Sequence, residues 1–523
     1  MGSLDRKLAP VDLSHHINLK SRSRHPSPLK DIIKFMGYDG MISLAGGLPH
    51  PSLFPIENAQ FDCLPPPSQK TRDGEVVNLH LGRGPSAGDL DLTQFLQYGS
   101  GAGNRQLVQL ATDLTERVHA PPCQYECLLH PGNTNAWSKV VGLLCEDNDF
   151  VVVEEFTYPS AQALWIPMGI KAAPVSADAE GILATSLRDT LENWDEKARG
   201  GKRPKLLYLV SVGSNPTGIT ISARRRKEIY AVCVEFDLVI VEDDPYYFLQ
   251  YPRYSQEEQQ PFQAEPPEQF LKSLVPSFLS MDTQGRVIRL ESFSKTLFPG
   301  LRLGYFVANP VFTERLLRVT EVETQDPAGL SQAFTIALFK QWGIDGYLAW
   351  LQNLQYQYKT RRNWLLSAFH DQFEVLPAAK SPVPTAQGYV ACLRDKSGKL
   401  RPVFSFVDPE AGMFVWSKFY FDGVPRFVEL ESQSLEDPEQ AFSQELWEAM
   451  AAELVLLTPG SYYHAWQGPD KVSTKARGAD PRSAYFRFSF ATPTKEQIHE
   501  AVKRVRTVLD RLWEVAARDI TAT

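Results

Sequence analysis

Short apolar runs alternate with helical patterns through the middle of the chain. The runs lie at 150–154, 205–210, 238–242 and 287–290. They are rich in Val, Ile and Leu without polar alternation, which is typical of strands covered on both faces. Between them, apolar residues recur at helical spacing over 134–145 and over 222–236, where Ser222 is a candidate N-cap. The alternation predicts an α/β domain with a mostly parallel sheet between helices.

The pattern changes after about residue 345. A helix rich in aromatic residues is predicted over 346–369, and a last helix over 495–516. Shorter strand patterns lie at 389–393, 413–416 and 485–490. This mixture predicts a separate α+β domain, so we expect a large domain over 56–345 and a small domain over 346–523.

The composition of the chain argues against several classes of protein. The 523 residues are 43% hydrophobic and 22% charged, with a net charge of -8. This is a folded composition, and the acidic balance argues against a nucleic-acid partner. No apolar run approaches the roughly 18 residues of a membrane span, and the 6 cysteines are too few for a disulfide scaffold. We expect a cytoplasmic protein, with a mitochondrial location as the alternative because residues 14–30 are basic and Ser-rich.

Lys295 stands out by its neighbours. It follows a predicted strand with Ser292 and Ser294, and Arg302 comes shortly after it. A nearby cation and partial burial lower the pKa of a lysine, which makes its amine a nucleophile. Hydroxyls and a guanidinium bind a phosphate ester well, and a lysine amine can bind an aldehyde. This cluster of side chains therefore indicates a site for pyridoxal phosphate. Ser292 and Lys295 also match the S-x-x-K of serine β-lactamases, but the S-D-N and K-T-G motifs of those enzymes are not found.

Asp243 lies at the end of another predicted strand, in VEDDPYYF. A carboxylate there can keep a pyridine nitrogen protonated, and Tyr246 could reach the phenolate oxygen of the cofactor. Asn215, held extended before a proline in SNPTG, could bind the same oxygen. The alternatives are an acidic turn and a simple Asn-Pro turn.

Two further segments fit the same cofactor. PGNTNAW opens a predicted helix at Asn133 and Thr134, where backbone N–H groups can bind phosphate. Tyr158 follows a strand and is a candidate to stack on a flat ring. The alternatives are an ordinary helix cap and a core aromatic residue.

Along the chain these motifs run from PGNTNAW through Tyr158, Asn215 and Asp243 to Lys295. In this order they resemble the class I, fold-type I aminotransferases, which use pyridoxal 5'-phosphate. The chain is similar to the branch that holds the fungal aromatic amino acid aminotransferases and the 2-aminoadipate/kynurenine aminotransferases, over roughly residues 25–512. The phrases that carry the resemblance are HPSPLK (25–30), ISLAGGLPHPSLFP (42–55), LQYGSGAG (96–103), SNPTG (214–218), VEDDPYYFLQY (241–251), GRVIRLESFSK (285–295) and YFRFSFA (485–491). It implies the fold-type I architecture, with an arm and lid segment over 1–55 that packs with the small domain.

The resemblance also implies roles for the matching residues. Lys295 would form a Schiff base with the cofactor and move the substrate proton. Asp243 would partner the ring nitrogen, Asn215 and Tyr246 the phenolate oxygen, and Tyr158 would stack on the ring. The phosphate would be bound by Asn133, Thr134, Ser292, Ser294 and Arg302.

The remaining implied roles concern the substrate and a second subunit. Arg487 would bind the substrate α-carboxylate, beside Asn215. Gly47 and Leu48 would belong to a mobile segment that covers the substrate. Tyr98 would reach the phosphate of the other subunit, which implies a homodimer. The stretches 252–277, 394–411 and 422–440 resemble insertions, and 252–277 is expected to be a surface loop.

We therefore expect transfer of an amino group from aromatic L-amino acids to 2-oxoglutarate or a phenylpyruvate-type acid, with no metal. A 2-aminoadipate/kynurenine aminotransferase is the alternative, although Lys30 replaces an arginine that some relatives place near the distal group of the substrate. A decarboxylase or β-lyase on the same fold would keep the Lys295 group. A non-catalytic regulator that binds pyridoxal phosphate would need a DNA-binding domain, for which the N-terminal segment is too short.

Overall fold

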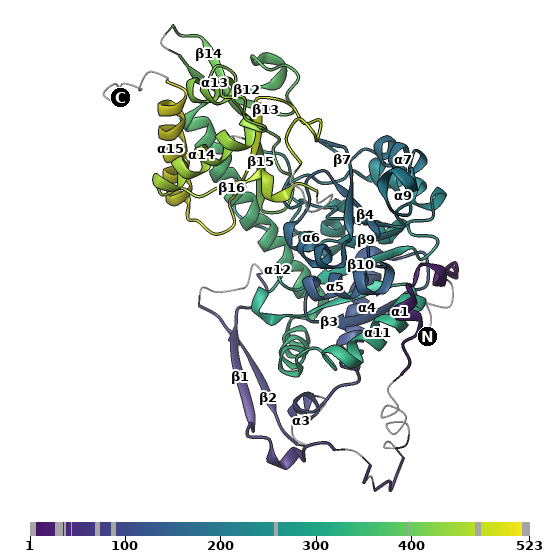
Figure 1. Ribbon diagram of the computed structural model, residues 1–523. Helices are drawn as coiled ribbons and strands as arrows, with labels where there is room; N and C mark the ends of the chain where they lie inside the picture. Colours follow the sequence, from purple (N-terminus) through teal and green to yellow (C-terminus); the bar gives the residue numbers. More distant parts are fainter. Residues whose placement is uncertain are drawn as a thin grey trace.

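The computed structural model describes residues 7–26, 35, 38–42, 44–45, 47–67, 74–84, 90–255, 260–395, 397–465 and 472–514. A large α/β part carries a seven-stranded sheet, and a smaller part with a six-stranded sheet lies above it in Figure 1. No helix in these ranges is both long and apolar enough to cross a membrane. The expected architecture, an α/β domain with a smaller α+β domain, is confirmed.

The sheet of the large part has the strand order β3-β11-β10-β9-β8-β4-β5. Its strands are β3 (Glu126–His130), β4 (Phe150–Glu154), β5 (Lys171–Val175), β8 (Leu206–Leu209), β9 (Val239–Asp243), β10 (Val287–Ser292) and β11 (Gly304–Ala308). β11 pairs antiparallel with both of its neighbours, β3 and β10, and the other neighbouring strands of this sheet pair in parallel. Every residue of β4, β8, β9 and β10 is buried, which explains the uninterrupted apolar runs that predicted them.

Helices cover both faces of this sheet. Phe150 and Val152 of β4 belong to one apolar core, whereas Val151 and Val153 belong to another, because successive side chains of a strand point to opposite faces. The first core includes residues of α4 (Arg105–His119), α7 (Ala184–Glu192) and α9 (Ala223–Glu235). The second includes residues of α5 (Asn133–Leu144), α6 (Pro159–Trp165) and α11 (Pro310–Glu323). The predicted N-cap is confirmed, since Ser222 Oγ accepts the backbone N–H of Arg225.

A long helix, α12 (Gly329–Gln372), connects the two parts (Figure 1). The helix is broken at Gly343, whose φ of 63° and ψ of 173° are not helical. A positive φ is a conformation that glycine adopts without the cost of a Cβ. The predicted helix over 346–369 is the second segment of α12, and the predicted domain boundary falls just after the break.

The small part is built on an antiparallel sheet with the order β12-β13-β14-β15-β17-β16. Its strands are β12 (Glu374–Pro377), β13 (Tyr389–Arg394), β14 (Leu400–Phe406), β15 (Phe414–Tyr420), β16 (Thr458–Pro459) and β17 (Ser483–Ser489), and its helices are α13 (Pro425–Ser432), α14 (Pro438–Ala452) and α15 (Lys495–Leu512). The stretches that resembled insertions therefore contain β14, α13 and, within the described part of 252–277, the helix α10 (Pro267–Ser273). The helix α10 corrects the expectation that 252–277 is a plain surface loop.

The N-terminal arm differs from expectation. Residues 7–26 pack on the large part and not on the small domain: the N–H of Val11 donates to Gln284 O and the N–H of Asn18 to Leu143 O. Leu13 and Ile17 are buried in the core of α5 and α11, so apolar burial holds the arm there. A hairpin of β1 (Asn58–Cys63) and β2 (Val77–Gly82) follows it along the chain and extends away from the sheet in Figure 1.

Candidate active site

A cavity of about 490 Å³ lies where the carboxyl ends of β4, β8, β9 and β10 meet the start of α5. Phe414, Tyr463 and Arg487, from the small part of the chain, also line it. The structure brings most of the predicted site residues to its wall: Asn133, Thr134, Tyr158, Asn215, Asp243, Tyr246, Ser292, Ser294, Lys295, Arg302 and Arg487. Sites of open α/β sheets lie at this edge, because the loops that follow parallel strands converge there.

Asp243 is the buried carboxylate of the cavity. The hydroxyl of Tyr208 donates to its Oδ2 over 2.8 Å, and the amide of Asn133 donates to its Oδ1 over 2.7 Å and to Leu290 O over 2.9 Å. Burial raises the pKa of Asp243, and the two hydrogen bonds oppose that rise. The carboxylate is therefore fixed in position and has neutral donors on both oxygens.

Tyr208 was not among the predicted site residues. It lies inside β8, in a run that is otherwise aliphatic, so the pattern marked it as a core residue. The available signal was its hydroxyl, because a buried tyrosine needs a hydrogen-bond partner. Phe414 and Tyr463, which reach the cavity from the other domain, were also not among the predicted site residues.

Lys295 and Arg302 make one wall of the cavity cationic. Burial and the nearby Arg302 guanidinium lower the pKa of Lys295 below its ordinary value. Nη1 of Arg302 donates to Ser294 Oγ over 3.3 Å and to Pro299 O over 2.9 Å, while Ser292 Oγ accepts the N–H of Ser294. A lysine with a lowered pKa presents more neutral amine at neutral pH, which is the nucleophilic form.

The start of α5 is shaped to meet Arg302. Gly132 precedes the helix with a φ of 103°, and a Cβ at this position would lie 2.1 Å from Arg302 Nη2. The positive φ favours glycine here, and the absence of a Cβ lets the Arg302 guanidinium approach the start of the helix. Gly132 caps the helix without a side-chain hydrogen bond, so the first N–H groups at Asn133 and Thr134 face the same region as the guanidinium. Helix N-termini with a guanidinium are an anion site.

Arg487 is held in the cavity wall by residues of both parts of the chain. Its Nη1 donates to Asn215 Oδ1 over 2.5 Å, and its guanidinium lies over the rings of Phe414 at 4.2 Å and Tyr463 at 5.1 Å. Burial lowers the pKa of Arg487, although an arginine stays charged at neutral pH. Within the described residues its buried Nε has no hydrogen-bond partner. The side chain therefore keeps donor capacity for a carboxylate.

Two tyrosines complete the cavity. Tyr246 is buried after β9, with its ring edge-on to Phe414 at 5.9 Å and 87°, and burial raises its pKa. Tyr158 is half-buried at the start of α6. Both lie at the cavity wall, as expected for residues that contact a flat ring and its oxygen.

Tyr98, Gly47 and Leu48 are not in this cavity. Tyr98 is 66% exposed and lines a separate cavity of about 630 Å³ with Pro49 and Phe54. Gly47 and Leu48 are exposed. The predicted contacts of Tyr98 with another subunit, and of Gly47 and Leu48 with the substrate, therefore stay predictions. Lys30 lies outside the described residues.

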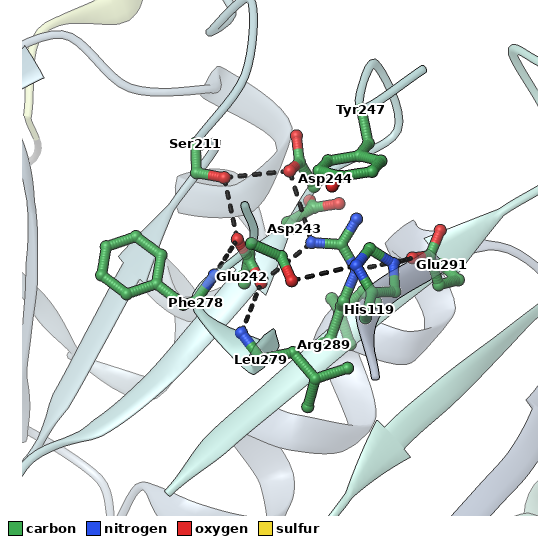
Figure 2. Close-up of polar contacts among 12 residues, drawn as sticks. His119, Ser211, Glu242, Asp243, Asp244, Tyr247, Phe278, Leu279, Arg289 and Glu291 are labelled. Atoms are coloured by element: carbon green, nitrogen blue, oxygen red, sulfur yellow. Dashed lines mark hydrogen bonds and ion pairs between the residues drawn. The ribbon is translucent and has the colours of Figure 1, made fainter. Parts of the chain in front are cut away.

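Figure 2 shows a network of buried charges behind Asp243. Arg289 lies 2.8 Å from Glu242 and 3.4 Å from Asp244, and all three side chains are fully buried. Burial raises the pKa of Asp244, and its Oδ2 accepts a hydrogen bond from the hydroxyl of Ser211. Only Asp243 of the acidic run lines the cavity, because its neighbours point to the other face of the sheet.

Comparisons with known proteins agree with this site. Residues 86–505 match the family described as aminotransferase class I and II. An aromatic amino acid aminotransferase of Schizosaccharomyces pombe is 36% identical over 96% of this chain and 98% of its own length. An L-tyrosine:2-oxoglutarate aminotransferase of Tapinella panuoides is 36% identical over 82% of this chain and 78% of its own length. The crystal structure of an aminotransferase from Candida albicans is similar with a TM-score of 0.83 and 31% identity, over 97% of this chain and 100% of that one.

Proposed function

The chain belongs to the class I and II aminotransferases, a family that depends on pyridoxal phosphate, and we propose that it transfers the amino group of Trp, Phe and Tyr to a 2-oxo acid. The observation that carries the proposal is that Lys295, Asp243 and Arg487 line one cavity. They offer a nucleophilic amine, a buried carboxylate and a fixed guanidinium, which are the groups that amino transfer requires.

The residues present fit pyridoxal phosphate. The anion site of α5 and Arg302, with the hydroxyls of Ser292 and Ser294, suits a phosphate group. When bound, the cofactor supplies a ring that withdraws electrons from the substrate α-carbon.

Each remaining role falls to a residue of the chain. Lys295 would hold the cofactor and move a proton at the substrate α-carbon, and Asp243 would keep the ring nitrogen protonated. Asn215 and Tyr246 would bind the ring oxygen, and Tyr158 would stack on the ring. Arg487 would bind the α-carboxylate through two N–H groups, a task that suits the planar guanidinium.

The walls of the cavity support an aromatic substrate. Trp137, Tyr158, Tyr246, Phe414 and Tyr463 contribute rings to them. The cationic lining residues among those described are Lys295, Arg302 and Arg487, and each already has a proposed role. An acidic side chain would find no further guanidinium in this lining, whereas an aromatic one gains apolar contact. Relatives with aromatic donors favour the same substrate class and 2-oxoglutarate as an acceptor.

Product analysis tests the proposed reaction. The holoenzyme with L-phenylalanine and 2-oxoglutarate should form phenylpyruvate and glutamate in equal amounts, without carbon dioxide. Carbon dioxide in place of phenylpyruvate would identify a decarboxylase and overturn the proposal. We further propose a homodimer in which Tyr98 reaches the neighbouring subunit, and a cytoplasmic location remains our expectation.

A further inference from the structure

Away from the cavity, the side chains of His15, His16 and Asp237 meet on the large part of the molecule. Nε2 of His15 lies 2.6 Å from Oδ2 of Asp237, and Nε2 of His16 lies 3.2 Å from Oδ1. One potential ligand atom from each residue lies within 4.8 Å of the others. Within the described part of the chain, no other group of three His, Cys, Asp or Glu side chains is gathered this closely.

The cluster joins two segments that are far apart in the sequence and firmly held. The histidines lie on a 3-10 turn, Ser14–His16, which is anchored because Asn18 Nδ2 donates to Gly142 O over 2.9 Å and to Cys145 O over 2.7 Å. Asp237 lies in the turn between α9 and β9 with a φ of 56°. The three side chains are therefore brought together by the fold itself.

His16 gives a second, independent observation. It is 2% exposed, and neither of its ring nitrogens has a hydrogen bond of good geometry within the described residues. Buried polar groups nearly always have a partner, and a bound ion is one explanation when none is seen. An ion between the imidazoles and the carboxylate would satisfy Nε2 of His16.

We propose that His15, His16 and Asp237 bind a divalent transition-metal ion, of which Zn²⁺ is the best match, through two imidazole nitrogens and one carboxylate oxygen. These are preferred Zn²⁺ ligands, and donors at about 2.1 Å from a tetrahedral ion lie roughly 3.4 Å apart. The 3.2 Å separation of His16 and Asp237 fits this value, and the 2.6 Å separation of His15 and Asp237 would widen. Each histidine binds through Nε2, so its ring proton is on Nδ1.

Solvent would complete the coordination. The side chains of His15 and Asp237 are 56% and 49% exposed, so an ion and a water molecule have access. Arg286 Nη1 lies 3.4 Å from Oδ1 of Asp237, which orients the carboxylate from outside the ligand set. A bound ion would fasten the N-terminal arm to the turn before β9.

A titration with Co²⁺ tests the site. The untagged, cofactor-loaded protein is first freed of metal ions with a chelator and is then titrated with Co²⁺. Four-coordinate Co²⁺ gives a visible absorption band, and we expect this band to saturate at one Co²⁺ ion per chain. Added Zn²⁺ should displace the Co²⁺ and abolish the band. His15→Ala and Asp237→Asn should each weaken Co²⁺ binding by at least about tenfold. Asn tolerates the left-handed conformation of position 237, so the turn should persist in that variant.

A matched histidine–carboxylate pair serves as the control. Nδ1 of His499 lies 3.2 Å from Asp371 Oδ2 on the other domain. His499→Ala should bind Co²⁺ as the wild type does. The proposal is overturned if the wild type gives no cobalt band, or if His15→Ala and Asp237→Asn bind Co²⁺ as tightly as the wild type.

Discussion

The hydroxyl of Tyr208 donates a 2.8 Å hydrogen bond to Oδ2 of Asp243, at the cavity end of two adjacent parallel strands. Tyr208 is 1% exposed, and its ring packs against Trp137 with centroids 4.4 Å apart. The bond favours the ionised carboxylate against the cost of burial. Tyr208 therefore positions the group that would keep the cofactor ring nitrogen protonated.

Tyr208→Phe removes this hydrogen bond and keeps the ring. We expect kcat/KM for amino donors to fall about tenfold, because a hydrogen bond to a charged group contributes about 1.5 kcal/mol or more. Cofactor binding should persist. Tyr230→Phe is the control, since its hydroxyl makes a 2.8 Å bond to Asp282 outside the cavity. Equal effects of the two substitutions on kcat/KM would show that Tyr208 is merely structural.

Lys295 should be the residue that carries the cofactor. Borohydride treatment of the yellow holoenzyme should fix pyridoxal phosphate on the peptide containing Lys295, and Lys295→Ala should lower turnover by roughly 10³-fold or more. Lys139 is the internal control, because burial lowers its pKa to about 8 while its Nζ is bonded to Thr320. Mass spectrometry that finds the label on Lys139 would refute the site assignment.

The lowered pKa of Lys295 also predicts a pH dependence. The neutral amine forms as pH rises through the lysine pKa, so a lowered pKa moves this change to lower pH. Attachment of pyridoxal phosphate to the apoenzyme should therefore reach its half-maximal rate below the ordinary lysine value of 10.5. A stopped-flow pH profile centred at or above that value would contradict the prediction.

Arg487→Lys keeps the charge and loses the bidentate fork. We expect kcat/KM to fall for all amino donors together, by about 2 kcal/mol or roughly 30-fold, with cofactor affinity unchanged. Arg482→Lys is the matched control, since Arg482 is exposed next to the same strand. Loss confined to one donor would show that Arg487 contacts the side chain of that donor and not the shared carboxylate.

Tyr98 should act across a subunit boundary. Tyr98→Phe should raise the dissociation constant of pyridoxal phosphate about tenfold, because one hydrogen bond to phosphate is lost. Tyr462→Phe, also at an exposed tyrosine, should not. Sedimentation should find the active enzyme as a dimer, and a fully active monomer would refute this role.

Much of the fold was predictable because a strand that is buried on both faces has an uninterrupted run of apolar residues, as in β4 and β9. β5 was missed because KAAPV holds a proline and two alanines, and β3 because ECLLH begins and ends with a polar residue, which leaves an apolar run of only three. Site residues in loops after strands were found from their neighbours, as with Lys295. Tyr208 was not, because only the three-dimensional structure brings its hydroxyl to Asp243.

The proposed specificity is tested most directly by kcat/KM for Trp, Phe, Tyr, aspartate, glutamate and 2-aminoadipate with one common acceptor. We predict that the aromatic donors exceed aspartate by at least roughly tenfold, because the described cavity lining offers rings and no further guanidinium for an acidic side chain. If aspartate or 2-aminoadipate gives the highest kcat/KM, the aromatic assignment is wrong.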